Sequence, residues 1–262
     1  MEKTKEKRLS RLDIIKGKAK LSDEDINLII ELRQEHIPIN NLKKYTDKDF
    51  RDLTEKEKEK LINELLSSEK YIRYKNCHIA ESKLLYDTSE TLAKETEALS
   101  CLDALGFEIY LLPYAYARDN MNCFQKSADS ITEGDFLEMK SVVSTGKTAG
   151  ESAYKDARYQ ADNVYLSIVN ETSEGKIINN IYRSIGAIKD KNKKNNIENN
   201  FKGMLFLNFE KNNKTSLYKI TKDGQAIKLS DATPKWFKKK QGNRTNRFPG
   251  CGGLHGKTWK ST

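Results

Sequence analysis

From Asp87 onward the chain alternates segments of helical period with short apolar segments of strand period, and this order most constrains its fold. We expect a helix over residues 89–105 that ends at Gly106, because glycine tolerates the left-handed conformation that closes helices. Three strands, a helix, a strand, a helix and two strands are predicted next, in the stretches FEIYLLPYAYA, KSADSIT, DFLEMKSVV, GESAYKDARYQAD, NVYLSIVN, KIINNIYRSIGAIKD, GMLFLNFE and SLYKITK. This order is typical of an α/β fold with an open mixed sheet flanked by helices.

The first third of the chain shows helical patterns and no strand signal. Ser22 with Asp25, and Thr54 with Glu57, match the capping box that starts a helix, and apolar stripes follow both pairs. The sequence therefore predicts three regions, which are a helical N-terminal region (1–86), an α/β core (87–231) and a tail rich in basic and aromatic residues (232–262).

The charge of the chain indicates an acidic partner. With 47 Lys and Arg against 38 Asp and Glu, the net charge is +9, which favours nucleic acid as that partner. Residues 232–262 hold eight basic residues, no acidic ones and four interleaved aromatic rings, a composition that suits phosphate contact and base stacking. A tail that only improves solubility explains the same composition. The candidate nucleic-acid-binding residues are Lys155, Arg158, Lys238, Lys239, Lys240, Arg244 and Arg247.

Membrane and secreted classes are not favoured. No apolar run approaches the roughly 18 residues that a membrane helix needs, and the charged N-terminus lacks the apolar segment of a secretory signal. The four cysteines are too dispersed for a disulfide framework, and their spacing to histidine matches no known zinc finger. We expect a cytoplasmic protein with reduced thiols.

The stretch KSADSITEGDFLEMKS, residues 126–141, predicts a hairpin that carries chemistry. If residues 133–134 form its tight turn, Asp129 lies opposite Glu138, and Lys140 shares their face. Cross-strand neighbours have Cβ atoms about 5 Å apart, and like charges there destabilise a sheet unless a positive charge compensates them. A divalent cation supplies that charge, and oxygen ligands favour Mg²⁺ or Mn²⁺ over zinc.

Such a hairpin fits phosphodiester hydrolysis. A bound metal ion lowers the pKa of water and neutralises charge on a phosphoryl oxygen, while a nearby lysine orients the water or stabilises the transition state. The alternative is a solvent-facing hairpin with three ordinary charged residues, because the pattern is short.

The motif SAD followed by LEMK resembles the PD-(D/E)xK nuclease signature, with Ala128 where proline usually stands. The stretches KETEALSCLDALGFEIYLLP, KSADSITEGDFLEMKS and RYQADNVYLSIV resemble one branch of that superfamily. This branch comprises the C-terminal nuclease domains of contact-dependent growth inhibition (CdiA-type) toxins and of toxins borne by phages or conjugative elements. The resemblance covers about residues 88–210.

The resemblance implies a restriction-endonuclease-like mixed β-sheet core flanked by helices and a Mg²⁺- or Mn²⁺-dependent nuclease. It favours a toxin-type endonuclease that cuts tRNA or other RNA, delivered into the cytoplasm of a target cell and matched by a cognate immunity protein. A DNA endonuclease of restriction or defence type stays open, as does a nucleic-acid-binding module without catalysis.

The resemblance also implies a metal-binding glutamate on the helix before the first strand. The candidates there are Glu90, Glu95 and Glu97. Glu95 falls within the apolar stripe of that helix, which consists of Leu92, Ala98, Leu99 and Leu102. A buried acidic residue is costly unless it is partnered, so Glu95 is the first choice and Glu97 the second.

An auxiliary residue near the active site is expected from the helix after the hairpin, where related nucleases often carry a glutamine. Gln160 holds this position. The predicted catalytic residues are therefore Glu95, Asp129, Glu138, Lys140 and Gln160, and the predicted metal ligands among them are Glu95, Asp129 and Glu138.

Overall fold

The computed structural model describes residues 9–32, 50–113, 128–146, 148–169, 173–181, 203–211, 214–220 and 226–232. Its helices are α1 (Arg11–Ile15), α2 (Asp23–Glu31), α3 (Glu55–Ser68), α4 (Glu81–Tyr86), α5 (Ser89–Asp103) and α6 (Ala149–Arg158), with a 3₁₀ helix at Phe50–Asp52 and a further helix at 174–181. Its strands are β1 (Lys20–Leu21), β2 (Tyr71–Tyr74), β3 (Cys77–Ala80), β4 (Ile109–Leu111), β5 (Ser130–Thr132), β6 (Asp135–Val142), β7 (Asn163–Ile168), β8 (Leu205–Lys211), β9 (Lys214–Ile220) and β10 (Ala226–Ala232).

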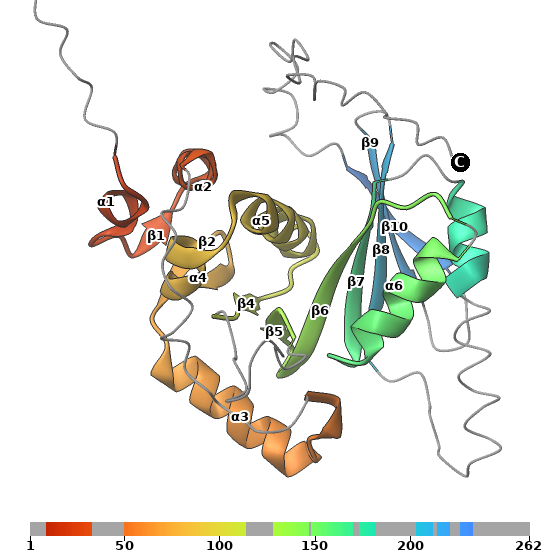
Figure 1. The fold of residues 1–262 in the computed structure, drawn as a ribbon, viewed down its shortest axis with the longest axis horizontal. Helices are drawn as coiled ribbons and strands as arrows, with labels where there is room; N and C mark the ends of the chain where they lie inside the picture. Colours follow the sequence, from red (N-terminus) through yellow and green to blue (C-terminus); the bar gives the residue numbers. More distant parts are fainter. Residues whose placement is uncertain are drawn as a thin grey trace, which may run out of the picture.

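The described strands form one ten-stranded mixed sheet in which neighbours in sequence are neighbours in space. The pairs β1–β2, β3–β4, β6–β7 and β7–β8 are parallel and the others antiparallel. Figure 1 shows α5 on one side of β6–β8 and α6 on the other. The predicted mixed sheet flanked by helices is therefore confirmed.

The expectation that residues 1–86 contain only helices is wrong. Strands β1, β2 and β3 lie in this region, and the parallel pair β3–β4 joins them to the rest of the sheet. These strands span only two to four residues, too few for a clear alternating pattern. The hairpin β2–β3 turns through Lys75, whose φ of 57° is rare outside glycine, asparagine and aspartate. Strand β10 was likewise not predicted from the sequence.

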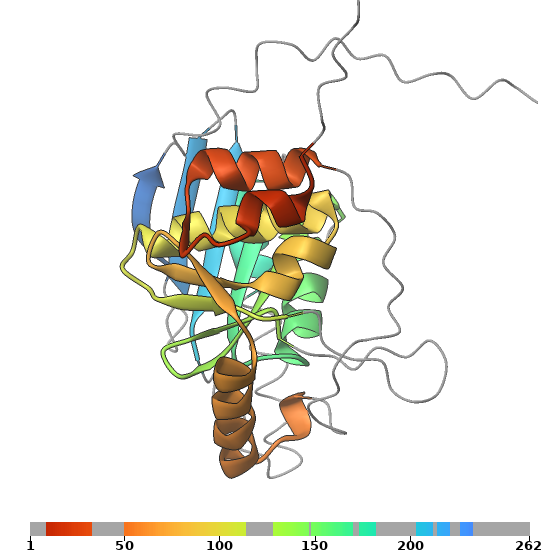
Figure 2. The same ribbon diagram turned by 90° about the vertical axis from the view of Figure 1, so that its left-hand side faces the viewer.

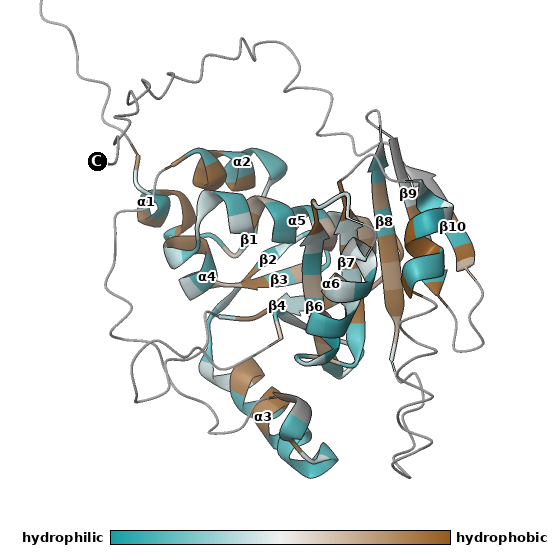
Figure 3. Cartoon of the chain, turned by 45° about the vertical axis from the view of Figure 1, so that its right-hand side comes forward, coloured by the Kyte–Doolittle hydropathy of each residue, from teal (hydrophilic) through white to brown (hydrophobic). Residues whose placement is uncertain are grey.

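The two faces of the sheet bury different apolar layers. Under α5, the helix residues Leu92, Leu99 and Leu102 share a core with Leu137 and Phe206 of the sheet. On the other face, the alternate strand positions pack against α6 and the helix at 174–181. Figure 3 shows the resulting apolar colour along β8. Because alternate strand residues face opposite layers, β6 presents Leu137 to α5 and Glu138 to α6.

Helix α2 packs onto α5, while α1 packs against α2 and α4 and holds the start of α5 in place through Arg11. Figure 2 shows α1 and α2 stacked over α5, with α3 at the opposite end of the sheet. The buried guanidinium group of Arg11 donates hydrogen bonds to the backbone oxygens of Leu84 and Asp87, at 3.2 and 2.7 Å, and to Ser89 Oγ at 2.9 Å. The junction between α4 and α5 is therefore fixed by three bonds from one side chain.

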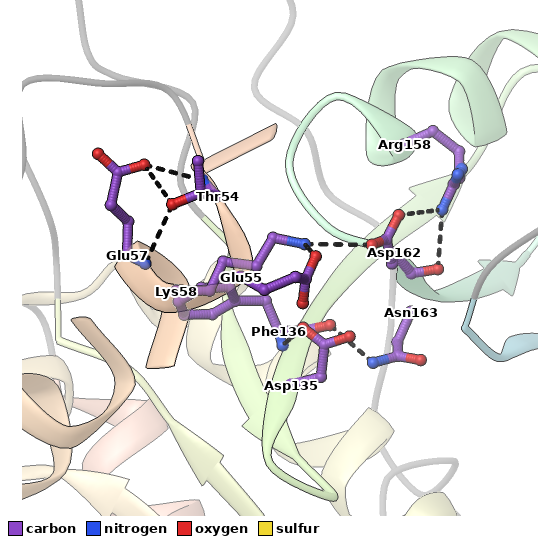
Figure 4. Close-up of polar contacts among 9 residues, drawn as sticks. All are labelled: Thr54, Glu55, Glu57, Lys58, Asp135, Phe136, Arg158, Asp162 and Asn163. Carbon is purple, nitrogen blue, oxygen red and sulfur yellow. Dashed lines mark hydrogen bonds and ion pairs between the residues drawn. The ribbon is translucent and has the colours of Figure 1, made fainter. Parts of the chain in front are cut away.

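Helix α3 is tied to the core beside the turn of the β5–β6 hairpin (Figure 4). Lys58 Nζ lies 3.3 Å from Asp162 Oδ2, and Arg158 of α6 donates to Asp162 Oδ1 at 2.8 Å. Phe50, just before α3, packs on Phe136 of β6 with ring centroids 4.5 Å apart. Within the described residues, no helix is long and apolar enough to cross a membrane.

Gly203, at the start of β8, is predicted to be intolerant of a side chain. Its φ is +79°, and an added Cβ would lie 2.4 Å from the backbone oxygen of Asp162. Gly203→Ala should lower the free energy of unfolding by at least about 2 kcal/mol through strain and overlap. Gly17 has a φ of +74° but nothing within 4 Å, so Gly17→Ala should cost about half as much. Urea denaturation of both variants measures this, and equal losses would contradict the prediction.

Candidate functional site

The β5–β6 hairpin has the predicted turn and register. Glu133 and Gly134 both have positive φ, 51° and 75°, as a type I′ turn requires. Ser130 pairs with Leu137, so the preceding residue, Asp129, lies opposite Glu138. Both carboxylates thus occupy adjacent antiparallel segments, as the turn residues predicted.

Backbone contacts hold Asp129 at this place. Its carboxylate accepts a hydrogen bond from the backbone N–H of Met139 at 2.9 Å, and its carbonyl oxygen accepts one from Leu112 at 2.9 Å. The side chain therefore takes the position of a strand acceptor just before the start of β5, which orients its carboxylate toward β6.

Glu138 is almost fully buried, with 1% of its surface exposed. Its Oε1 atom lies 2.5 Å from Lys140 Nζ and accepts a hydrogen bond from Gln160 Nε2 at 2.9 Å. Its Oε2 atom has no hydrogen-bond partner among the described residues. Burial, with the nearby Asp129 charge, raises the pKa of Glu138 to about 9. The structure thus brings Lys140 and Gln160 to the same carboxyl group.

Glu95 of α5 is buried as its place in the apolar stripe predicted. Its Oε1 atom lies 2.6 Å from the ammonium group of Lys83, and its Oε2 atom lacks a hydrogen-bond partner within the described residues. Burial, followed by the charges of Asp129 and Asp87, raises the pKa of Glu95 to about 8 even though Lys83 opposes the shift.

Lys83 is the residue that the sequence analysis missed. It lies on α4 with 5% of its surface exposed, and its Nζ is 3.8 Å from Asp87 Oδ2. Burial alone would lower the pKa of Lys83, but Glu95, Asp129 and Asp87 together raise it above its ordinary value. The sequence signal was a lysine four residues before an aspartate, beside two leucines, in a segment with no other motif.

Asp129 connects the two halves of the site. Its charge acts on Glu95 and Lys83 of the helical side and on Glu138 and Lys140 of the hairpin side. It also acts on Asp87, which is paired with Lys83. Four carboxyl groups and two ammonium groups therefore form one electrostatic cluster, drawn from α4, α5 and the β5–β6 hairpin.

The other glutamates of α5 lie elsewhere. Glu90 is exposed and pairs with Lys94 at 2.7 Å. The carboxyl group of Glu97 contacts Glu210 of β8, on the sheet face away from Glu138. The structure thus separates Glu90 and Glu97 from Asp129 and brings Glu95 to it.

The predicted phosphate contacts are engaged within the protein or lie outside the described residues. Lys155 pairs with Glu151 at 2.5 Å, and Arg158 pairs with Asp162 at 2.8 Å. The tail positions Lys238, Lys239, Lys240, Arg244 and Arg247 lie outside the described residues. Binding of nucleic acid by these residues stays a prediction.

The donor atoms of the cluster suit a hard cation. Among the described residues, no three His, Cys, Asp or Glu side chains surround one point closely enough to hold a metal ion. The cluster nevertheless contains three buried carboxylate oxygens without a hydrogen-bond partner among the described residues, one each on Asp87, Glu95 and Glu138. Oxygen donors alone match Mg²⁺ or Mn²⁺, so the predicted metal fits the chemistry of the residues present.

The raised pKa values of Glu95 and Glu138 predict how stability depends on pH without divalent metal. Both groups bind a proton more tightly in the folded protein, so their stabilising effect is full below the ordinary glutamate pKa and is lost as pH rises toward 8–9. Glu138→Gln should flatten this decline and stabilise the protein at pH 8 by about 1 kcal/mol or more. Thermal unfolding in EDTA at pH 5.5 and 8 measures this, and an unchanged slope in the variant would contradict it.

Comparison with known proteins assigns no family to this chain. No protein-family model matches it, and neither a curated protein nor a solved structure does. The chemistry of Glu95, Asp129, Glu138 and Lys140 is therefore what indicates a function.

Proposed function

We propose that this chain is a metal-dependent nuclease that hydrolyses phosphodiester bonds on a restriction-endonuclease-like core. One observation carries the proposal. Asp129, Glu138 and Lys140 are held by a type I′ hairpin in one cluster with Glu95 from the preceding helix. A sheet gains no stability from buried like charges, so a catalytic role accounts for their presence better than a structural one.

Each residue has a distinct role in this proposal. Asp129, Glu138 and Glu95 would hold a Mg²⁺ or Mn²⁺ ion, which would supply charge neutralisation at the phosphate and a more acidic bound water. Gln160 orients the Glu138 carboxylate through its hydrogen bond. Lys140 is the more exposed of the two lysines, with 34% of its side chain accessible, and it faces the substrate. Lys83 compensates the buried charge of Glu95.

The substrate proposed first is tRNA or another RNA, cut by a toxin-type endonuclease of a mobile element or polymorphic toxin system with a cognate immunity protein. This choice rests on the resemblance of residues 88–210 to such toxins. A DNA endonuclease of restriction or defence type would use the same cluster. Incubation of purified protein with plasmid DNA and with total tRNA, in Mg²⁺ and in EDTA, separates the two.

Substitution of the carboxylates and substitution of Lys140 are predicted to impair different steps, metal binding in the first case and the chemical step in the second. Asp129→Ala and Glu138→Ala should abolish Mn²⁺ binding and cleavage together, because they remove ligands. Lys140→Ala should bind Mn²⁺ and nucleic acid nearly normally while single-turnover cleavage falls by about 100-fold or more, the scale of one lost transition-state contact.

Glu95→Ala and Glu90→Ala form a matched pair on α5 for the same assays. The exposed Glu90 variant should cleave like the parent, whereas the Glu95 variant should lose Mn²⁺ affinity and cleavage. Calorimetric Mn²⁺ titration measures the metal affinity of each variant. Full activity in EDTA, or Lys140→Ala cutting at the parent rate, would refute the nuclease proposal.

The tail is predicted to contribute affinity and not chemistry. Removal of residues 233–262 deletes eight basic residues, so binding should weaken and its dependence on salt should flatten. Each lost phosphate contact removes about 0.7–0.9 from the slope of log affinity against log salt concentration. Titration of labelled nucleic acid at several salt concentrations measures this. An unchanged slope would assign the tail to solubility alone.

A further inference from the structure

A second polar cluster lies on the sheet face opposite Glu138, under α5. Tyr165 and Ser167 of β7 and Asn208 and Glu210 of β8 occupy alternate positions of paired parallel strands, so their side chains share one face. Tyr165 and Phe206 belong to the apolar core beneath α5, which identifies this face as the one that α5 covers. Four polar side chains therefore interrupt a layer that is otherwise apolar.

Helix α5 adds two residues, Glu97 and Cys101, whose separation along the helix matches that of Asn208 and Glu210 along β8. Glu97 and Cys101 are one turn apart, about 6 Å along the helix, and Asn208 and Glu210 are two residues apart, about 6.6 Å along β8. Asn208 Nδ2 lies 3.9 Å from Cys101 Sγ, and the Glu97 carboxyl contacts that of Glu210. The helix and the strand thus face each other through two polar contacts.

Three oxygens of this cluster lack hydrogen-bond partners among the described residues. They are Glu97 Oε1, Asn208 Oδ1, which is on a fully buried residue, and the buried hydroxyl oxygen of Tyr165. Glu210 already accepts a hydrogen bond from Ser167 Oγ at 2.7 Å. A shared proton would relieve the repulsion between Glu97 and Glu210, yet it would leave the Asn208 oxygen unsatisfied at a cost of about 1–3 kcal/mol. A cation coordinated by Glu97, Glu210 and Asn208 removes both penalties.

A cavity with three carboxylates in its lining adjoins this cluster at Glu97. It has a volume of about 250 Å³, lies between α2 and α5, and includes Glu97 in its lining. Asp23 and Glu31 of α2 line it as well, so its carboxylates favour entry of a positive ion. Through this cavity a cation can approach Glu97, whereas Asn208 and Glu210 are not among its lining residues.

We propose that Glu97, Glu210 and the amide oxygen of Asn208 form a second site for a hard divalent cation, separate from the cluster around Asp129. Two carboxylates and an amide oxygen are ligands of the Mg²⁺, Mn²⁺ and Ca²⁺ class, with water completing the coordination. Cys101 places a sulfur beside these oxygens, but a ligand set dominated by oxygen favours this class of cation over zinc.

The cation would fasten α5 to β8, and α5 carries Glu95 only two residues before Glu97. The site is therefore structural and holds the helix that supplies one carboxylate to the Asp129 cluster. Its existence does not depend on the proposed nuclease activity, because none of its three ligands belongs to that cluster.

Calorimetric Mn²⁺ titration of the EDTA-treated full-length protein tests the proposal with four proteins: the parent, Glu138→Gln, Glu210→Gln and the double variant. The parent should bind two ions, each single variant one, and the double variant none, with at least about tenfold weaker affinity at the altered site. If Glu210→Gln binds like the parent, the second site does not exist. If Glu138→Gln binds like the parent, the metal of the nuclease proposal fails while the second site stands.

Asn208→Asp supplies a gain-of-binding arm in the Glu138→Gln background. A third carboxylate should lower the unfolding temperature in EDTA and raise it by several degrees when Mn²⁺, Mg²⁺ or Ca²⁺ is added. The rise with Zn²⁺ should be smaller, because the ligands are oxygens. Destabilisation that no cation reverses would show that Glu97 and Glu210 share only a proton, and it would overturn the proposal.

Discussion

The burial of carboxylates next to lysines is the interaction on which the site depends. Glu95 and Glu138 are both removed from solvent, and each has an ammonium group within hydrogen-bonding distance, Lys83 at 2.6 Å and Lys140 at 2.5 Å. Desolvation costs several kcal/mol per buried ion, and a well-placed counter-charge recovers only part of it. The surrounding helices and hairpin must therefore hold these groups in place, and the raised pKa values record the remaining penalty.

Three contacts of the scaffold hold the charged groups in place. The type I′ turn sets the position of Asp129 against Glu138, Arg11 fixes the junction from which Lys83 and Glu95 extend, and Asp162 ties α3 to the end of α6. They keep charged side chains in an arrangement that would otherwise relax toward water, as expected where function is favoured over stability.

Local patterns predicted the parts of the site that local chemistry determines. The Glu-Gly turn placed Asp129, Glu138 and Lys140 together, and the apolar stripe of α5 singled out Glu95 for burial. Lys83 was not predictable in this way, because its partners Glu95 and Asp129 are distant in sequence and meet it only after α4 and α5 pack. The short strands β1–β3 were not predicted for a related reason. Their pairing with the rest of the sheet specifies them, and their own sequence pattern does not.

We propose that Asp129 and Glu138 together hold a divalent metal ion, and anomalous diffraction from crystals soaked in Mn²⁺ can locate such an ion. We expect an anomalous peak within coordination distance of both carboxylates, with Lys140 beside it and no such peak in crystals of Glu138→Gln. A parent crystal with Mn²⁺ bound elsewhere, and none between Asp129 and Glu138, would show that these carboxylates hold no metal.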